Sequence, residues 1–186
     1  DANTTGNYNT AFGAYSLTSA TTASSNTAFG YAAMSTTTTG ADNVAIGFQA
    51  LQVNTTGTGN VVVGSYALDA NTTGSYNTVL GHGALTVSTT GVENVAVGAY
   101  SLDANTTGGY NVAVGNYSLS ANTTGIENTA LGRRSLEVNT TASYNTALGY
   151  TSLGSNTTGT KNTAIGNTAG STVTTGSNLT LVGYNA

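Results

Sequence analysis

Apolar and polar residues recur along this chain with a fixed period of 17 residues. The clearest marker is an asparagine that returns at every seventeenth position without an insertion or deletion: Asn9, Asn26, Asn43, Asn60, Asn77, Asn94, Asn111, Asn128, Asn145 and Asn162. Numbered from this residue, the unit reads N-[TV]-A-Φ-G-x-x-[AS]-L-x-x-N-T-T-G-x-x, where Φ is a large apolar residue. An incomplete unit over 1–8, ten units over 9–178 and an incomplete unit over 179–186 make up the chain. We therefore predict a single repeat array.

The alternation within one unit predicts two short strands and two turns. Position 2 is Thr or Val and position 4 is a large apolar residue, so we expect both to face the core and position 3, mostly Ala, to lie on the opposite face. The apolar residues at positions 9 and 11 predict a second strand. Asn-Thr-Thr-Gly (71–74 in one unit) predicts a closing turn with its Gly in the left-handed region. Position 5 is always glycine, which predicts a positive φ or a close backbone approach after the first strand: Gly13, Gly30, Gly47, Gly64, Gly81, Gly98, Gly115, Gly132, Gly149, Gly166 and Gly183.

Two short strands in a strict repeat predict an all-β fold, a parallel β-solenoid or β-roll with one 17-residue unit per coil. Coils stacked at about 4.8 Å would form a rod about 50 Å long. A helix is a poor alternative because glycine interrupts every unit. The asparagines at position 1 would stack into a ladder, in which amide groups bond along the stack and to turn carbonyls.

Composition narrows the functional classes. Only 5% of the 186 residues are charged, against about 25% in an average soluble domain. A charge in a strict repeat would be copied into a column of like charges, which explains this scarcity. Three basic residues and a net charge of −4 argue against nucleic-acid binding. No apolar run approaches the length of about 18 residues that would insert into a membrane. Cysteine is absent, which excludes disulfides and thiolate metal sites.

Candidate catalytic and metal-binding residues are few. His82 is the only histidine, so a catalytic triad would depend on it. Acids recur in register, with Asp69, Asp103 and Glu137 at position 10 and Glu93 and Glu127 at position 17. Neighbours in each set are two coils apart, roughly 10 Å, which is too far for one Ca²⁺ ion to bridge easily. We expect no enzymatic activity, no metal site and no cofactor.

Aromatic side chains follow the position-5 glycine in most units and form the candidate ligand-contact stripe. Its members are Tyr15, Tyr31, Phe48, Tyr66, Tyr100, Tyr117, Arg133, Arg134 and Tyr150. The rings could grip sugars or a receptor surface, or they could cover the turn and fill a groove between chains. The arginine pair could bind an acidic glycan or mark a variable loop. A second column, Tyr8, Tyr76, Tyr110 and Tyr144, flanks the asparagine ladder at position 17.

The repeated Asn-Thr-Thr has two further interpretations. It forms glycosylation sequons at Asn3, Asn54, Asn71, Asn105, Asn122, Asn139 and Asn156, which we interpret as turn chemistry. The paired Thr columns at positions 13 and 14 suggest an ice-binding solenoid as an alternative function. Adjacent residues in a strand point in opposite directions, so this pair fits a flat ice-binding array less well than T-x-T would.

Two large aliphatic residues per unit make a thin core. Burying a large side chain contributes roughly 1.5–3 kcal/mol, whereas ordering the backbone costs about 1–2 kcal/mol per residue. We therefore expect copies of the chain to share a core, most simply as a homotrimer, with the Ala face of the strands packed against the partners.

The units NVAVGNYSLSANTTG (111–125) and NTALGYTSLGSNTTG (145–159) are similar to head repeats of trimeric autotransporter adhesins and to repeats of phage tail fibres. This resemblance covers essentially the whole chain, although the adhesin heads usually have a shorter repeat. It implies a segment of a longer trimeric fibre on a virion or cell surface, extracellular and used for attachment to a host glycan or receptor. The alternatives are the ice-binding solenoid and a self-assembling extracellular filament.

Overall fold

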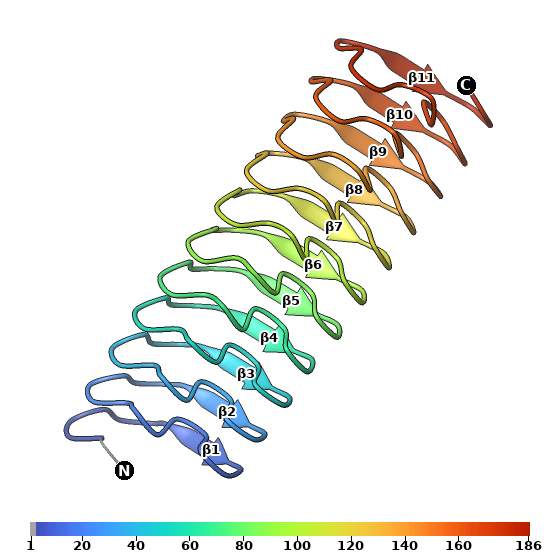
Figure 1. Cartoon of the computed structure of the whole chain (residues 1–186). Helices are drawn as coiled ribbons and strands as arrows, with labels where there is room; N and C mark the ends of the chain where they lie inside the picture. Colours follow the sequence, from blue (N-terminus) through green and yellow to red (C-terminus); the bar gives the residue numbers. More distant parts are fainter. Residues whose placement is uncertain (1–2) are drawn as a thin grey trace.

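The computed structural model describes residues 3–186 and shows a straight β-solenoid with one strand in each coil (Figure 1). Eleven parallel strands form one sheet in chain order, and no helix occurs in the part of the chain that is described. The strands are β1 (Thr10–Phe12), β2 (Thr27–Phe29), β3 (Val44–Ile46), β4 (Val61–Val63), β5 (Thr78–Leu80), β6 (Val95–Val97), β7 (Val112–Val114), β8 (Thr129–Leu131), β9 (Thr146–Leu148), β10 (Thr163–Ile165) and β11 (Thr180–Val182). Each strand residue pairs with the residue 17 positions away, as Val95 does with Val112. The predicted parallel solenoid with a 17-residue coil is confirmed.

The strands face the opposite way from the sequence prediction. The central residue, position 3, points into the coil and is fully buried in β2 to β10, as Ala113 is in β7. Positions 2 and 4 point outward, and Phe29 and Leu131 are 52% and 42% exposed. The prediction that positions 2 and 4 face the core is therefore wrong. The expectation that the Ala face packs against partner chains is wrong as well, because position 3 is buried inside the coil. The coil is so thin that the residue behind most strands is Ala, and the largest fully buried residue there is Val, at Val62 and Val79, because the opposite side of the coil already fills the interior.

The predicted second strand is also wrong, because this half of each coil is a continuous turn. Positions 7 and 9 have positive φ, as in Tyr100 (56°) and Leu102 (52°), which a strand does not allow. Their amides still bond to neighbouring coils. Tyr100 donates to the preceding coil at His82 O, and Leu102 donates to the following coil at Ser118 O, both at 3.1 Å. The expected inward direction of position 11 is wrong as well, since Val87 is 42% exposed.

The hydrophobic core is one column of large side chains packed on one column of small ones. The large residues occupy position 9 and are fully buried: Met34, Leu51, Leu68, Leu85, Leu102, Leu119, Leu136 and Leu153. They pack against the position-3 residues and the buried Ala or Ser at position 8. Most coils thus supply one large side chain to the core, and the coils of Val62 and Val79 add a valine from the strand.

The asparagines at position 1 form a buried ladder of hydrogen bonds that links successive coils. Asn111 donates its backbone N–H and its Nδ2 to Asn94 Oδ1, at 3.0 and 3.2 Å. The same Nδ2 donates to Gly125 O at 2.9 Å within its own coil. The position-12 asparagines form a second ladder, in which Asn122 Nδ2 donates to Asn105 Oδ1 and also to Gly125 O. One turn carbonyl therefore accepts from both ladders.

The two repeated glycines have different roles. At position 5 every φ is strongly positive, and a Cβ on Gly98 (φ 124°) would lie 2.7 Å from the carbonyl oxygen of Gly115 in the next coil. A side chain is therefore excluded at this turn. At position 15 no φ is positive within residues 3–186, and the left-handed residue is position 17, such as Tyr110 (φ 62°). The predicted left-handed conformation of the Asn-Thr-Thr-Gly glycine is wrong, and Ala23 and Ala142 occupy the same position in two units.

Candidate ligand-binding surface

Seven rings contact one another in a continuous column along the rod, which we call the aromatic ladder. Its members are Tyr15, Tyr31, Phe48, Tyr66, His82, Tyr100 and Tyr117. Neighbouring centroids are 5.2–6.0 Å apart. His82, which is not part of the predicted stripe, makes T-shaped contacts with Tyr66 and Tyr100 and thus continues the column. Position 6 or 7 supplies each ring, directly after the glycine turn.

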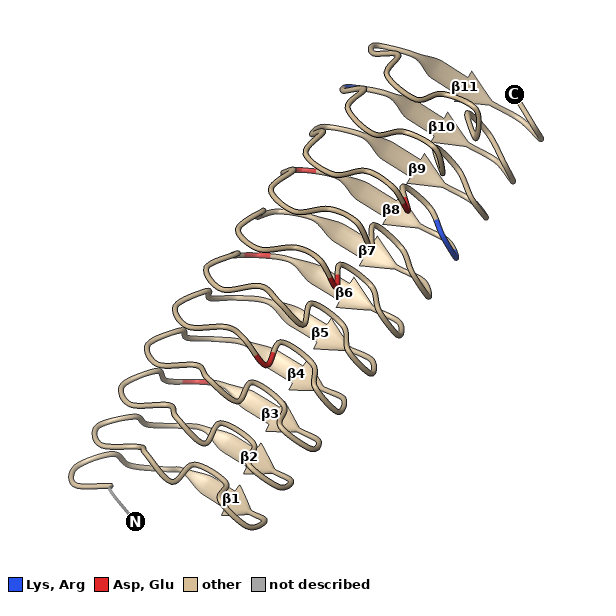
Figure 2. Cartoon of the chain, in the orientation of Figure 1, with Lys and Arg blue, Asp and Glu red and all other residues tan. Residues whose placement is uncertain are grey.

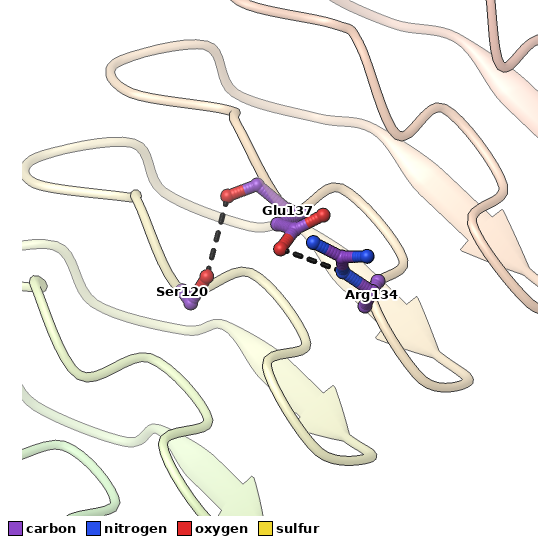
Figure 3. A network of polar contacts seen from close by, with 3 residues as sticks. All are labelled: Ser120, Arg134 and Glu137. Carbon is purple, nitrogen blue, oxygen red and sulfur yellow. Dashed lines mark hydrogen bonds and ion pairs between the residues drawn. The ribbon is translucent and has the colours of Figure 1, made fainter.

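The arginine pair extends the aromatic ladder at its C-terminal end. Arg133 lies over the ring of Tyr150, 5.8 Å from its centroid. Arg134 Nε donates to Glu137 Oε1 at 2.8 Å, and Ser120 Oγ donates to the backbone carbonyl of Glu137 at 3.4 Å (Figure 3). The charge of Arg134 is therefore paired within its own coil, whereas Arg133 stacks on a ring.

A polar column runs beside the aromatic ladder at position 10, three or four residues further along each coil. It consists of Thr18, Ser35, Gln52, Asp69, Thr86, Asp103, Ser120 and Glu137, and we call it the polar column. Partial burial raises the pKa of both Asp69 and Asp103 above the ordinary aspartate value, against the opposing effect of backbone hydrogen bonds. Asp103 Oδ1 is covered and accepts no hydrogen bond within the described chain.

Two hollows open between the aromatic ladder and the polar column. The first has a volume of about 370 Å³ and is lined by Tyr15, Tyr31, Gln49 and Gln52 together with hydroxyl side chains. The second has a volume of about 290 Å³ and is lined by Tyr117, Arg133, Arg134 and Glu137. Both combine rings with hydrogen-bonding groups, as ligand sites for polar molecules do.

The remaining charged residues are isolated on the rod (Figure 2). Glu93 and Glu127 lie at position 17, in the second Tyr column. Glu93 lies between the exposed Tyr76 and Tyr110, and Glu127 lies between Tyr110 and Tyr144. Within residues 3–186 no group of three His, Cys, Asp or Glu side chains is close enough to hold a metal ion.

The sequons at position 12 are structural in the folded chain. Asn54, Asn71, Asn105, Asn122, Asn139 and Asn156 are fully buried, and Asn3 is exposed. Asn122 Nδ2 donates both of its hydrogens, one to Asn105 Oδ1 and one to Gly125 O. The nitrogen that would carry a glycan is therefore inaccessible at the six buried positions.

The paired threonines lie in a turn and not on a flat strand. At position 13 the hydroxyl bonds to the next coil, as Thr106 Oγ1 does to Thr123 O at 3.0 Å. At position 14 the side chain is exposed, as in Thr107. Only one of the two threonine columns is thus free to meet solvent.

The sequence prediction missed one extended surface because it placed these residues in the core. We call it the outer sheet face, formed by positions 2 and 4 of the eleven strands. It contains no charged residue. At position 4 it presents Phe12, Phe29, Ile46, Val63, Leu80, Val97, Val114, Leu131, Leu148, Ile165 and Val182, none of them buried. Phe12 and Phe29 stack on it at 4.8 Å. An uninterrupted apolar strip of this kind is typical of an interaction surface.

No family model, curated protein or solved structure matches this chain. No helix among residues 3–186 is long and apolar enough to cross a membrane.

Proposed function

We propose that this chain is a structural and adhesive shaft segment of a homotrimeric fibre, extracellular or on a virion, that mediates attachment to a host or another surface. The outer sheet face is the observation that carries this proposal. Its position-4 residues form an apolar strip that is continuous over all eleven strands, and the face carries no charge, so a solitary chain would leave this strip in water.

A second and a third copy of the chain are the occupants that best fit the outer sheet face. Ten steps of about 4.8 Å and a strand length of about 10 Å give a strip of about 500 Å² per copy. Two such strips bury about 1,000 Å², which is the lower limit for a specific interface. In parallel copies, each coil also stays at the same height as its equivalent in the neighbouring chain, because the repeat has no insertion. The resemblance to trimeric adhesin heads favours three chains around a common axis.

The aromatic ladder supports the attachment role. It follows the glycine turn and is not on the strands, so packing at the outer sheet face leaves its rings accessible. Copies of such a surface in one fibre bind with avidity, since each contact raises the effective concentration for the next.

Sedimentation velocity and native mass spectrometry test the assembly. We expect a trimer for the unmodified chain and a folded monomer for the double variant Leu131→Lys/Leu148→Lys, because two charges enter the outer sheet face. The matched control, Val87→Lys/Val138→Lys, places the same charges on exposed valines at position 11 and should remain trimeric. Circular dichroism verifies that each variant is folded. A stable monomer of the unmodified chain would overturn the proposal, and a dimer would overturn the trimer.

Ice binding and filament formation predict different measurements. The position-13 hydroxyls donate hydrogen bonds to the next coil, as Thr106 does, so they are less available to bind ice. Thermal hysteresis of the purified chain would nevertheless favour the ice-binding function, and open polymers in electron micrographs would favour a filament.

A further inference from the structure

The groove between the aromatic ladder and the polar column combines two kinds of wall. One wall is rings, and the other is hydroxyl, amide and carboxylate groups from position 10 of the same coils. The hollows of about 370 and 290 Å³ both lie between these walls. The coils repeat without insertion, so the walls stay side by side from coil to coil. The first hollow lies in the first three units and the second in the seventh and eighth, and between them the rings and the polar side chains keep the same positions from coil to coil, which extends the two walls along the rod.

We propose that this groove binds a linear, uncharged hexose polysaccharide whose chain runs along the rod. The proposal rests on the attachment role above and names its ligand class. A pyranose ring has an apolar face of C–H groups and an equatorial rim of hydroxyls, which match a ring wall and a hydrogen-bonding wall respectively.

The arrangement of the rings leaves aromatic surface available for such stacking. Four of the six contacts in the aromatic ladder are T-shaped, and Tyr66 makes both of its contacts in this way. In a T-shaped contact one ring meets its neighbour by its edge, so the faces of that ring stay free of the neighbour. Tyr31, Phe48 and Tyr66 remain 41–45% exposed.

The polar column supplies one acceptor atom that lacks a donor within residues 3–186. Asp103 Oδ1 is covered and accepts no hydrogen bond from any described residue, and burial raises the pKa of this carboxyl. Sugar hydroxyls would supply the missing donors after a small rotation of the side chain, and hydrogen bonds to a carboxylate are the stronger kind. An anionic glycan would instead bring like charges to Asp69 and Asp103. The two arginines that line the second hollow already have partners, since Arg133 lies over Tyr150 and Arg134 is paired with Glu137.

The acids of the polar column also have a suitable spacing. Asp69, Asp103 and Glu137 are separated by 34 residues, or two coils, which is about 10 Å. This distance is comparable with one disaccharide unit of an extended hexose chain. Equivalent hydroxyls of alternate sugars would thus meet the carboxylates of Asp69 and Asp103, whereas Glu137 in the same register is paired with Arg134. A hexasaccharide would reach both aspartates, and a disaccharide only one.

Isothermal titration calorimetry with neutral hexasaccharides of the cello, laminari, manno and chito series tests this proposal, with oligogalacturonate of the same length as the charged comparison. We expect at least one neutral series to bind more tightly than oligogalacturonate and more tightly than its own disaccharide. The double variant Tyr31→Ala/Phe48→Ala should raise the Kd about tenfold or more, and Asp103→Asn several-fold. Alanine occupies position 6 naturally at Ala14 and Ala99, so the double variant should fold.

Controls separate the groove from the rest of the surface. Tyr76→Ser/Tyr110→Ser removes two exposed tyrosines of the second Tyr column, and Glu93→Gln removes an acid there; both should leave the Kd unchanged. The proposal is wrong if no neutral hexasaccharide binds at millimolar concentration, if oligogalacturonate binds best, or if the controls weaken binding equally. Sedimentation of the same samples reports the oligomeric state separately, so a failure of glycan binding is distinguishable from a failure of the trimer.

Discussion

At the residue scale, the contacts between coils depend on residues that can recur at the same position in every coil and still fit their copies in the coils before and after. Asparagine carries both a donor and an acceptor, so Asn111 can accept from one coil and donate to another. Aspartate at the same place would stack negative charges in a buried column. Glycine at position 5 has the same property for another reason, because adjacent coils approach until no Cβ fits, as at Gly98.

The two partly buried aspartates predict a specific dependence of stability on pH. Burial raises the pKa of Asp69 and Asp103 in the folded chain, so the folded state binds protons more readily than the unfolded state. Their ionisation therefore lowers the free energy of unfolding above the raised pKa, and this penalty disappears as the pH falls below the ordinary aspartate value. We expect Asp69→Asn/Asp103→Asn to be more stable than the unmodified chain at pH 7 and equally stable near pH 3.

Urea unfolding midpoints across this pH range provide the measurement. Glu93→Gln/Glu127→Gln removes the same number of charges from the other acid column and controls for the change in net charge. A stability gap that does not change with pH, or that widens as the pH falls, would contradict the assignment of the penalty to burial.

At the scale of elements, the period and the strand at positions 2–4 could be predicted, but the direction of that strand could not. We assumed that the larger apolar residue faces the core, whereas Ala113 faces inward and Val114 outward in β7. The size of the interior decides this, and Leu119 fills the interior from the opposite side of the coil. The alternation of residues along one strand contains no information on the distance between the two sides of a coil.

The sequence of positions 6–11 indicates a turn through the residue types at position 9, although the apolar pattern of this segment favours a strand. Position 9 is Leu in eight units, Met in one and Gly in one, and it is never β-branched. Val, Ile and Thr are rare at positive φ, so their absence marks a left-handed position and argues against a strand. The contact between His82 and two tyrosines was not predictable, because it depends on the alternation of rings between positions 6 and 7.

This interpretation predicts that Leu119→Ile is destabilising although the two side chains have the same volume. Leu119 has a φ of 53°, where a β-branched residue is strained at a cost of about 1–3 kcal/mol. The matched control is Leu131→Ile in β8, since Ile46 and Ile165 occupy the same strand position naturally. Urea unfolding of both variants checks the prediction, and equal stability of the two would indicate that position 9 tolerates a strand conformation.

At the scale of the whole molecule, each coil contacts only its neighbours. Every strand pairs with the strands immediately before and after it, and the ladders follow the same rule. Stability is then close to a sum of identical coil and interface contributions. The chain has no central region whose loss would remove the core.

Removal of one complete unit should therefore leave a folded rod. Deletion of residues 94–110 joins Glu93 to Asn111 in the correct register and lets β5 pair with β7. Deletion of residues 94–102, about half a unit, would shift every ladder downstream and should abolish folding of the array. Circular dichroism and the thermal midpoint distinguish the two outcomes, and equal behaviour of the two deletions would contradict the nearest-neighbour architecture.

The hydrogen bonds between coils lie along the rod axis, which determines how the molecule responds to tension. A pull on the two ends of one chain loads the bonds of a terminal coil first, because the hydrogen bonds between coils in residues 3–186 join neighbouring coils. A coil that occupies about 4.8 Å of the rod releases 17 residues that extend to roughly 60 Å. The 17 residues of a coil that peels away are thus more than ten times longer than the step that the coil occupied in the rod. Under load the solenoid is therefore a tether that lengthens one coil at a time while the remaining coils stay folded.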